Sequence, residues 1–241
     1  MKSDRKKPPA VIPVTPPAIK PVMLQAEPEP IEIDLQRAAV IVVDMQNAFI
    51  SKGGMVNLWG GDTLPRQKLI KPIRRITDTA RAKGLKVVKV AMTYSPDLSD
   101  TGGPNSPNWY KTGLASYIKH PEWRDKMLFR GTWGANIVEE LKPQEDDILV
   151  HKPRYSAFFG TDLDTILKTS NAKYLVFVGV NTNICVEASI RDAYYLDYFP
   201  ILISDATMNW GPAFTQEAAI LNVKSCYGWV TTTENIIKAM E

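Results

Sequence analysis

Histidine is almost absent from this sequence, and its scarcity limits the catalytic chemistry open to the chain. The 241 residues include only two histidines, His120 and His151. A metal site built from several imidazoles would lack ligands. A mechanism that needs an imidazole at every proton transfer is excluded for the same reason.

Cysteines, long apolar runs and excess charge are scarce as well. Two cysteines do not make a disulfide framework, so a reducing, cytoplasmic location is expected. No run of about 18 uncharged apolar residues exists, which argues against a membrane-spanning helix. A net charge of +3 is too small to indicate nucleic-acid binding. We therefore expect a small molecule as ligand, with neither nucleic acid nor a membrane as partner.

Proline is concentrated at the N-terminus. Eight of the 18 prolines lie within residues 1–30, where the missing N–H and the fixed φ angle favour an extended, poorly packed arm. The arm could be a flexible tail, a strap on a neighbouring subunit or a basic segment that touches nucleic acid or membrane; the first two are favoured. Residues 31–241 are then expected to form one domain, and the composition of the whole chain, 44% hydrophobic and 23% charged, is ordinary for a globular protein.

Short apolar segments alternate with amphipathic ones along this domain. Apolar residues at successive positions indicate strands buried on both faces, and the alternation is typical of βαβ units. The prediction is a three-layer α/β/α fold of the Rossmann type with a mostly parallel sheet of about six strands. The expected strands are Ala38–Asp44, Leu85–Met92, Asp147–His151, Tyr174–Gly179, Pro200–Ser204 and Tyr227–Val230. The expected helices are Leu64–Lys83, Asp162–Lys168, Ile184–Tyr198, Ala213–Lys224 and Glu234–Met240.

Three reactive residues fall where predicted strands end. Asp44 closes the first strand, Lys152 follows the third, and Cys185 begins the helix after the Tyr174–Gly179 strand. Ligands of an open parallel sheet bind at the carboxyl ends of its strands, so these side chains can meet. The long segment Ser95–Arg130 is interpreted as an insertion that covers this site.

Cys185 is the expected nucleophile. A thiol at a helix N-terminus meets partial positive charge and free N–H groups, which lower its pKa. The polar turn before it, Gly179-Val-Asn-Thr-Asn, can supply N–H groups to an oxyanion. A buried core cysteine is the ordinary alternative, and Cys226 is assigned to that role.

The two histidines are poor candidates for the base that the thiol needs. His151 and Lys152 are neighbours in a strand and should face opposite sides of the sheet. His120 is expected to be a surface residue. Asp44 is therefore the expected proton acceptor, with Lys152 stabilising its charge and the thiolate.

Three separate segments carry a family resemblance. Ile41–Phe49, Lys152–Phe158 and Gly179–Asp192, in this order, closely resemble the isochorismatase-like cysteine hydrolases, and the similarity extends over about residues 31–239. It implies an Asp44–Lys152–Cys185 triad, a cis peptide between Val180 and Asn181, and an oxyanion hole formed by the N–H groups of Asn181 and Cys185. The Asp-x-His metal motif of nicotinamidases is absent, so no metal and no cofactor is expected.

Further similarities within the family suggest a substrate class. Gly102–Asn108, Gly211–Phe214 and Tyr227–Val230 resemble family members that hydrolyse ureidoacrylate, whereas Pro96–Asp100 is more similar to biuret-type hydrolases. The expected activity is hydrolysis of a C–N bond in a small linear ureido or carbamoyl compound, releasing ammonia or an amine. Biuret, triuret and N-carbamoyl amino acids are alternative substrates, and a catalytically idle binding or scaffold protein is the non-enzymatic alternative. A homo-oligomer, dimer or tetramer, is expected.

Substrate contacts are expected from the loops that cover the triad. Asp100 could accept a hydrogen bond from a ureido –NH2, and Arg154 could pair with a carboxylate or form an ordinary surface salt bridge. Tyr94 and Trp109 could form the walls of the pocket, and Tyr155 could bind a carbonyl or carboxylate.

Overall fold

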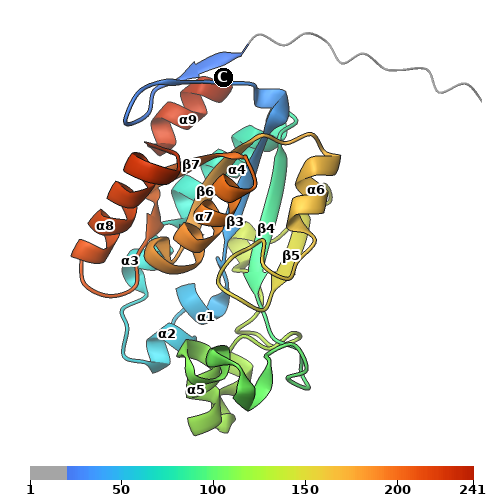
Figure 1. The fold of residues 1–241 in the computed structure, drawn as a ribbon. Coiled ribbons are helices and arrows are strands. Elements are labelled where there is room, and N and C mark those ends of the chain that lie inside the picture. The colour runs from blue at the N-terminus through green and yellow to red at the C-terminus, as the bar shows by residue number, and fades with distance from the viewer. Residues whose placement is uncertain (1–20) are drawn as a thin grey trace, which may run out of the picture.

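The computed structural model describes residues 21–241, and its centre is a six-stranded parallel sheet (Figure 1). The strand order is β5-β4-β3-β6-β7-β8, and every neighbouring pair is parallel. The predicted α/β fold is confirmed. The strands are β3 (Ala38–Val43), β4 (Lys86–Met92), β5 (Ile148–Lys152), β6 (Tyr174–Val180), β7 (Phe199–Met208) and β8 (Trp229–Thr231).

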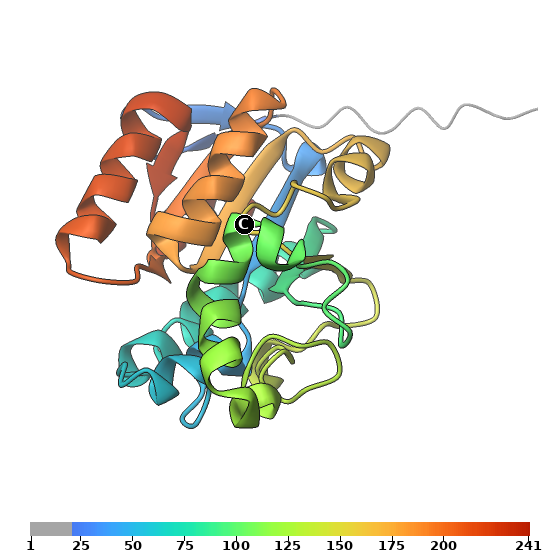
Figure 2. The ribbon, with the colours of Figure 1, turned by 60° about the horizontal axis from the view of Figure 1, so that its bottom comes forward.

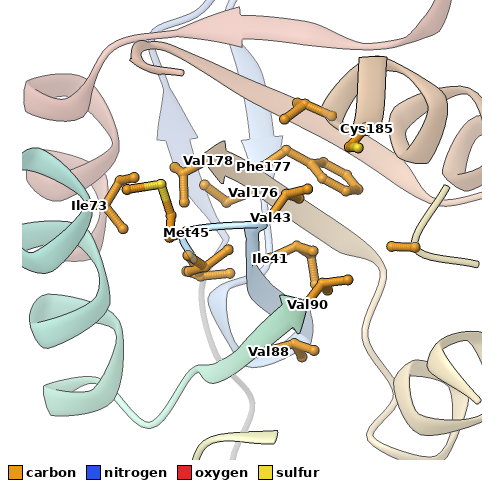
Figure 3. Packing of buried hydrophobic residues seen from close by; sticks show 14 of the residues in the cluster. Ile41, Val43, Met45, Ile73, Val88, Val90, Val176, Phe177, Val178 and Cys185 are labelled. Carbon is orange, nitrogen blue, oxygen red and sulfur yellow. The ribbon is translucent and has the colours of Figure 1, made fainter. Parts of the chain in front are cut away.

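Helices cover both faces of this sheet. Helix α4 packs against β3, β4 and α9, and α7 packs against β7. Figure 3 shows Ile73 of α4 and Cys185, which precedes α7, on opposite sides of the central strands. The helices are α1 (Asn47–Ile50), α2 (Met55–Leu58), α3 (Leu64–Gln67), α4 (Ile70–Ala82), α5 (Thr112–Lys119), α6 (Leu163–Thr169), α7 (Glu187–Tyr195), α8 (Phe214–Asn222) and α9 (Thr233–Met240).

The central strands are apolar throughout because both of their faces are covered. All six residues of β3, Ala-Ala-Val-Ile-Val-Val, are buried, as are the last six of the seven residues of β6. Their side chains interleave with those of the helices in one continuous core (Figure 3). Removing such apolar surface from water supplies about 25 cal/mol per Å², so this core fixes the strand ends that carry the polar residues.

The last ten residues of the proline-rich segment differ from the prediction of a poorly packed arm. Strand β1 (Val22–Leu24) pairs antiparallel with β2 (Ile31–Ile33), and Leu24 is fully buried. Glu27 exchanges two backbone hydrogen bonds with Val230 of β8, of 2.8 and 2.9 Å. The prolines lie before β1 and in the turn, where no ladder donor is needed, so they do not prevent pairing. Residues 1–20 lie outside the described part.

The carboxyl ends of the strands face the end of the molecule where α1, α2 and α5 gather (Figure 1). The β1–β2 hairpin lies at the other end, beside α9. Figure 2 turns the first end forward and shows the segment around α5 in front of the sheet. The predicted insertion, residues 95–130, therefore folds as short helical turns and α5 at this end.

Candidate active site

The three predicted catalytic side chains meet at the point where the strand order reverses direction. The chain runs from β3 outward to β4 on one side, and from β6 outward to β7 on the other. Asp44 directly follows β3, and Cys185 lies in a π-helical turn, Thr182–Val186, directly after β6. Lys152 is the last residue of β5. A crevice at such a switch point is where open α/β sheets bind ligands.

Asp44 and Lys152 form a fully buried ion pair. The Lys152 Nζ lies 2.9 Å from Asp44 Oδ2, and neither side chain has exposed surface. The other carboxylate oxygen, Oδ1, accepts a hydrogen bond of 2.8 Å from the backbone N–H of Met92. Lys152 also donates to the backbone carbonyl of Arg154 at 3.1 Å. These contacts orient both charges toward the sulfur of Cys185. His151 precedes Lys152 in β5 and is exposed on the opposite side of the strand, as predicted.

Gln46 supports this pair, although the sequence analysis did not identify it. Its Nε2 donates to the carbonyls of Met92 and Ala135, at 3.0 and 2.8 Å, and its Oε1 accepts from the Met92 N–H at 3.0 Å. The same N–H thus serves both Asp44 and Gln46. A glutamine two residues after a strand-end aspartate in an otherwise apolar stretch is the signal that could have identified it.

Burial dominates the electrostatics of Cys185, which is 2% exposed. Loss of solvent raises the pKa of the thiol, the Asp44 carboxylate raises it further, and the Lys152 ammonium opposes both. This differs from the predicted depression of the thiol pKa, because desolvation outweighs the helix N-terminus. The resting sulfur is therefore a protonated thiol beside a carboxylate.

The charge of Lys152 is held in place by its neighbours. Burial acts to lower the pKa of its ammonium group, but the pKa is raised overall, and the charge of the Asp44 carboxylate is the largest cause that raises it. Lys152 is therefore a cation throughout the neutral range.

A tight turn joins β6 to the π-helical turn that carries Cys185. Gly179 has a φ of 111°, and a Cβ there would lie 2.1 Å from the carbonyl oxygen of Val43, so only glycine lets β6 approach β3 this closely. The next peptide, Val180–Asn181, is cis. Within residues 21–241, the Asn181 N–H donates to no protein acceptor, although Asn181 is only 7% exposed.

A small, partly open pocket lies over Cys185. Its volume is about 30 Å³, room for one or two water molecules. Its wall is mostly apolar and aromatic, and its polar residues include Thr112, Asn181 and Tyr155. The lining residues are Phe49, Met55, Val56, Trp59, Met92, Thr112, Leu128, Tyr155, Asn181, Ile184, Cys185 and Trp210.

The structure brings two of the five proposed substrate-contact residues to this region. Tyr155 lines the pocket, and its hydroxyl lies 3.1 Å from the Thr112 hydroxyl. Tyr94 is buried beside it; burial raises the pKa of its phenol, and the neighbouring Tyr155 and Cys185 add to the effect.

The other three proposed contacts lie away from the pocket wall. Asp100 accepts hydrogen bonds of 2.9 and 3.0 Å from the Ser95 N–H and pairs with Arg130 at 3.1 Å. Arg154 donates to backbone carbonyls, including that of Asp100 at 3.1 Å, so it stabilises the same loop. Trp109 is half-buried in a 3-10 turn and does not line the pocket.

Several pocket residues were missed because sequence distance hid them. Trp59, on the segment after α2, packs edge-on against Trp210 with ring centroids 5.5 Å apart. Arg66 of α3, which is buried but does not line the pocket, was missed too; its guanidinium carbon lies 5.5 Å from the Trp210 ring centroid. Cys226, assigned to the core, is in fact exposed, because it lies on a π-helical turn rather than in a strand.

In the described part of the chain, no three His, Cys, Asp or Glu residues are grouped as metal ligands. Nor does any described helix have the length and apolarity to cross a membrane.

Comparison with known proteins points in one direction. The isochorismatase domain matches residues 38–235. Ureidoacrylate amidohydrolase RutB of Caulobacter segnis is 44% identical over 222 residues, which cover 92% of this chain and 93% of that relative.

Two solved structures also share this fold. A cysteine hydrolase from Pseudomonas syringae pv. phaseolicola has a TM-score of 0.73 and 29% identity, and the match covers 86% of this chain and 94% of the other. N-carbamoylsarcosine amidase from Thermoplasma acidophilum has a TM-score of 0.62 and 25% identity, with 82% and 97% covered.

Proposed function

The chain belongs to the isochorismatase family, and from this membership we propose that it is a cysteine-dependent amidohydrolase acting on a small linear ureido compound, with ureidoacrylate as the first candidate. The observation that carries the proposal is the buried Asp44–Lys152 pair beside the Cys185 thiol. A thiol, a base and a fixed cation in an apolar pocket suit attack on an amide carbonyl. The name of the 44% identical relative supports the substrate.

In the proposed first step, Cys185 attacks the carbonyl carbon of the substrate. The S–H proton passes to the Asp44 carboxylate as the C–S bond forms, so the raised thiol pKa is overcome at the moment of attack. The carbonyl oxygen becomes an oxyanion that accepts from the N–H groups of Asn181 and Cys185. Each such donor is worth about 3–4 kcal/mol at the barrier. Lys152 keeps its proton and stabilises the site while Asp44 is neutral.

The tetrahedral intermediate then collapses to an acyl-enzyme. The C–N bond breaks, and the leaving ammonia or amine takes the proton from Asp44. A water molecule next attacks the thioester carbon, giving its proton to Asp44. Collapse of this second intermediate breaks the C–S bond, and the proton returns to the sulfur, which restores the free thiol.

Other carbamoyl compounds are the second candidates. The similarity of Pro96–Asp100 to biuret-type hydrolases and the fold shared with an N-carbamoylsarcosine amidase support them. An ammonia-release screen over ureidoacrylate, biuret, triuret, N-carbamoyl amino acids and simple amides separates these substrates. Ureidoacrylate is expected to give the highest kcat/KM; a higher value for biuret would move the assignment to the biuret-type branch.

Trapping of the acyl-enzyme tests the covalent step directly. Acid quenching during turnover followed by peptide mass spectrometry is expected to find the acyl group on Cys185. The Cys226→Ser variant is the matched background, because Cys226 is exposed and reacts with added reagents on its own. Absence of both ammonia release and adduct for every compound would favour the idle scaffold alternative.

The same proposal includes a compartment and an assembly. Both cysteines are free thiols, which supports a reducing compartment such as the cytoplasm. Tyr194 and Tyr195 of α7 are 47% and 67% exposed, which supports a homo-oligomer through that helix. Sedimentation of the full chain tests the assembly.

A further inference from the structure

Arg66 is a buried cation near the active site without an acidic partner in residues 21–241. The residue is 3% exposed, and no carboxylate within this part of the chain lies within 4 Å of its guanidinium. Burial lowers the pKa of the guanidinium to about 10, so the charge is still present at neutral pH. A buried charge is destabilising unless its contacts or its function offset the loss of solvent.

The polar and aromatic contacts of Arg66 are with residues that line the pocket or adjoin its lining. Its Nη1 donates to the side-chain Oδ1 of Asn181 at 2.7 Å, and its Nη2 donates to the backbone carbonyl of Asn209 at 3.0 Å. The guanidinium carbon lies 5.5 Å from the ring centroid of Trp210. Asn181 and Trp210 both line the pocket over Cys185, whereas Arg66 itself does not.

A second set of bonds ties the same elements together. Asn183 Nδ2 donates to the Trp210 carbonyl at 3.0 Å, and the Trp210 N–H donates to Asn183 Oδ1 at 2.9 Å. The turn Asn181–Asn183 is therefore held against residues 209–210. Arg66 joins the same two segments, because it donates to both Asn181 and Asn209. The backbone N–H of Asn181, which donates to no acceptor in the described chain, is a member of this turn.

We propose that Arg66 is a positioning residue for the oxyanion site: it holds Asn181 so that its free N–H meets the reacting carbonyl oxygen, and its positive charge favours the negative charge that develops there. The proposal rests on the amidohydrolase function proposed above. The planar fork of arginine suits two acceptors that lie in different directions, whereas a lysine ammonium on a flexible stem does not fix both. Arg66 touches neither the sulfur nor the pocket space, so it acts through Asn181.

Kinetics of three variants test this role. Arg66→Met is expected to lower kcat by about ten- to a thousandfold with KM changed less than threefold, because only the transition state carries the oxyanion. Arg66→Lys is expected to recover part of kcat. Asn181→Ala keeps the backbone N–H but removes the tether, so its loss and that of Arg66→Met should not multiply in the double variant.

Arg75→Met is the matched control, because Arg75 is an exposed arginine paired with Glu234 outside the pocket. It is expected to leave kcat unchanged. Losses that multiply in the double variant, or a rise in KM at constant kcat, would overturn the proposal; the latter would make Arg66 a substrate-binding residue. Thermal midpoints are measured for all variants, and comparison uses those that remain folded at the assay temperature.

A measurement without turnover separates this inference from the proposed function. Carbon-13 acetaldehyde adds to Cys185 as a hemithioacetal: a C–S bond forms, and the carbonyl becomes a hydroxyl or oxyanion in the same site. Binding is followed by NMR in the Cys226→Ser background. Arg66→Met is expected to weaken adduct formation at least tenfold even if no ureido compound is hydrolysed, and equal binding would refute the role of Arg66.

Discussion

Two lysines on neighbouring strands are both fully buried, yet they have opposite environments. Lys152 of β5 lies 2.9 Å from the Asp44 carboxylate, and its pKa is raised. Lys89 of β4 has no exposed surface, and its Nζ has no hydrogen-bond partner within residues 21–241. Burial, helped by the charge of Arg81 and opposed by Asp147, lowers the pKa of Lys89 to about 8.

The difference arises from which cation pairs with the carboxylate near each lysine. Asp147 lies close enough to Lys89 to affect its pKa, but Arg81 takes both of its oxygens in a bidentate pair of 3.0 and 2.7 Å. Within the described part of the chain, Lys152 is the one cation in contact with Asp44, so the carboxylate stabilises the charge of Lys152. A buried lysine can therefore keep its charge and serve in catalysis where a carboxylate pairs with it. Without such a partner, the buried lysine destabilises the fold.

The largest expected effects come from breaking the Lys152 side of the comparison. Lys152→Met should lower kcat at least about a thousandfold. It should also lower the free energy of unfolding by about 3–5 kcal/mol, because Asp44 is left as an unpaired buried charge. Urea unfolding and ammonia release measure the two losses. In the double variant Asp44→Asn/Lys152→Met, stability should largely return while activity does not; a double variant as unstable as Lys152→Met would contradict the ion-pair account.

Cys185→Ala sharpens the same point by removing the third member alone. Turnover should disappear, since no nucleophile remains, and the free energy of unfolding should fall by only about 1–3 kcal/mol because one small buried group is lost. Activity losses of the Asp44, Lys152 and Cys185 variants should not add, because the three act as one unit. Retention of more than a few per cent of kcat in Cys185→Ala would exclude the covalent mechanism.

Changing Lys89 should have the opposite sign. Lys89→Met removes a poorly solvated amine and fills its space, so the free energy of unfolding at pH 7 should rise by about 1–3 kcal/mol. The value of kcat should be unchanged, because Lys89 does not line the pocket. Urea unfolding at pH 7 checks this, and a destabilised variant would show that Lys89 has a partner in solution.

The pH dependence of stability gives the comparison a sign. The folded pKa of Lys89, about 8, lies below its ordinary value of 10.5, so the unfolded chain binds the proton more readily between these pH values. Burial of the charged Lys89 therefore lowers the free energy of unfolding by about 3 kcal/mol below pH 8. This loss of stability disappears as the pH rises toward 10.5. The stability advantage of Lys89→Met over the natural chain should therefore shrink from pH 8 to pH 10. A constant advantage across this range would assign it to packing alone.

Chelation is expected to have the smallest effect of all. The cation beside Cys185 is the Lys152 ammonium, which pairs with Asp44, and the mechanism proposed above uses no metal. Exhaustive dialysis against a chelator should leave kcat/KM unchanged. Bound zinc in stoichiometric amount, lost together with activity, would contradict this expectation.

The sequence predicted the parts of the site that strand ends determine. Asp44, Lys152 and Cys185 each follow an apolar run, and the carboxyl ends of parallel strands must share one edge, so their meeting could be inferred. Arg66 could not be found in this way, because nothing local distinguishes a buried arginine on a short helix from a surface one. Asp100 belongs to a long loop, whose internal bonds to Ser95 and Arg130 have no periodic signal. The same limit applies to Cys226, whose exposure depends on a π-helical turn.

The size of the pocket over Cys185 has a kinetic consequence. A space of about 30 Å³ has room for water but not for a ureido compound, so we expect the wall to open before the reacting carbonyl enters. Trp59 donates to the Ser116 hydroxyl at 2.9 Å, and Thr112 meets Tyr155, so both contacts join the α5 segment to the rest of the wall. We therefore expect each turnover to begin and end with a movement of that segment. Solvent friction slows such a movement. If opening of the wall, rather than bond breaking, is the rate-limiting step, a more viscous buffer should lower kcat/KM.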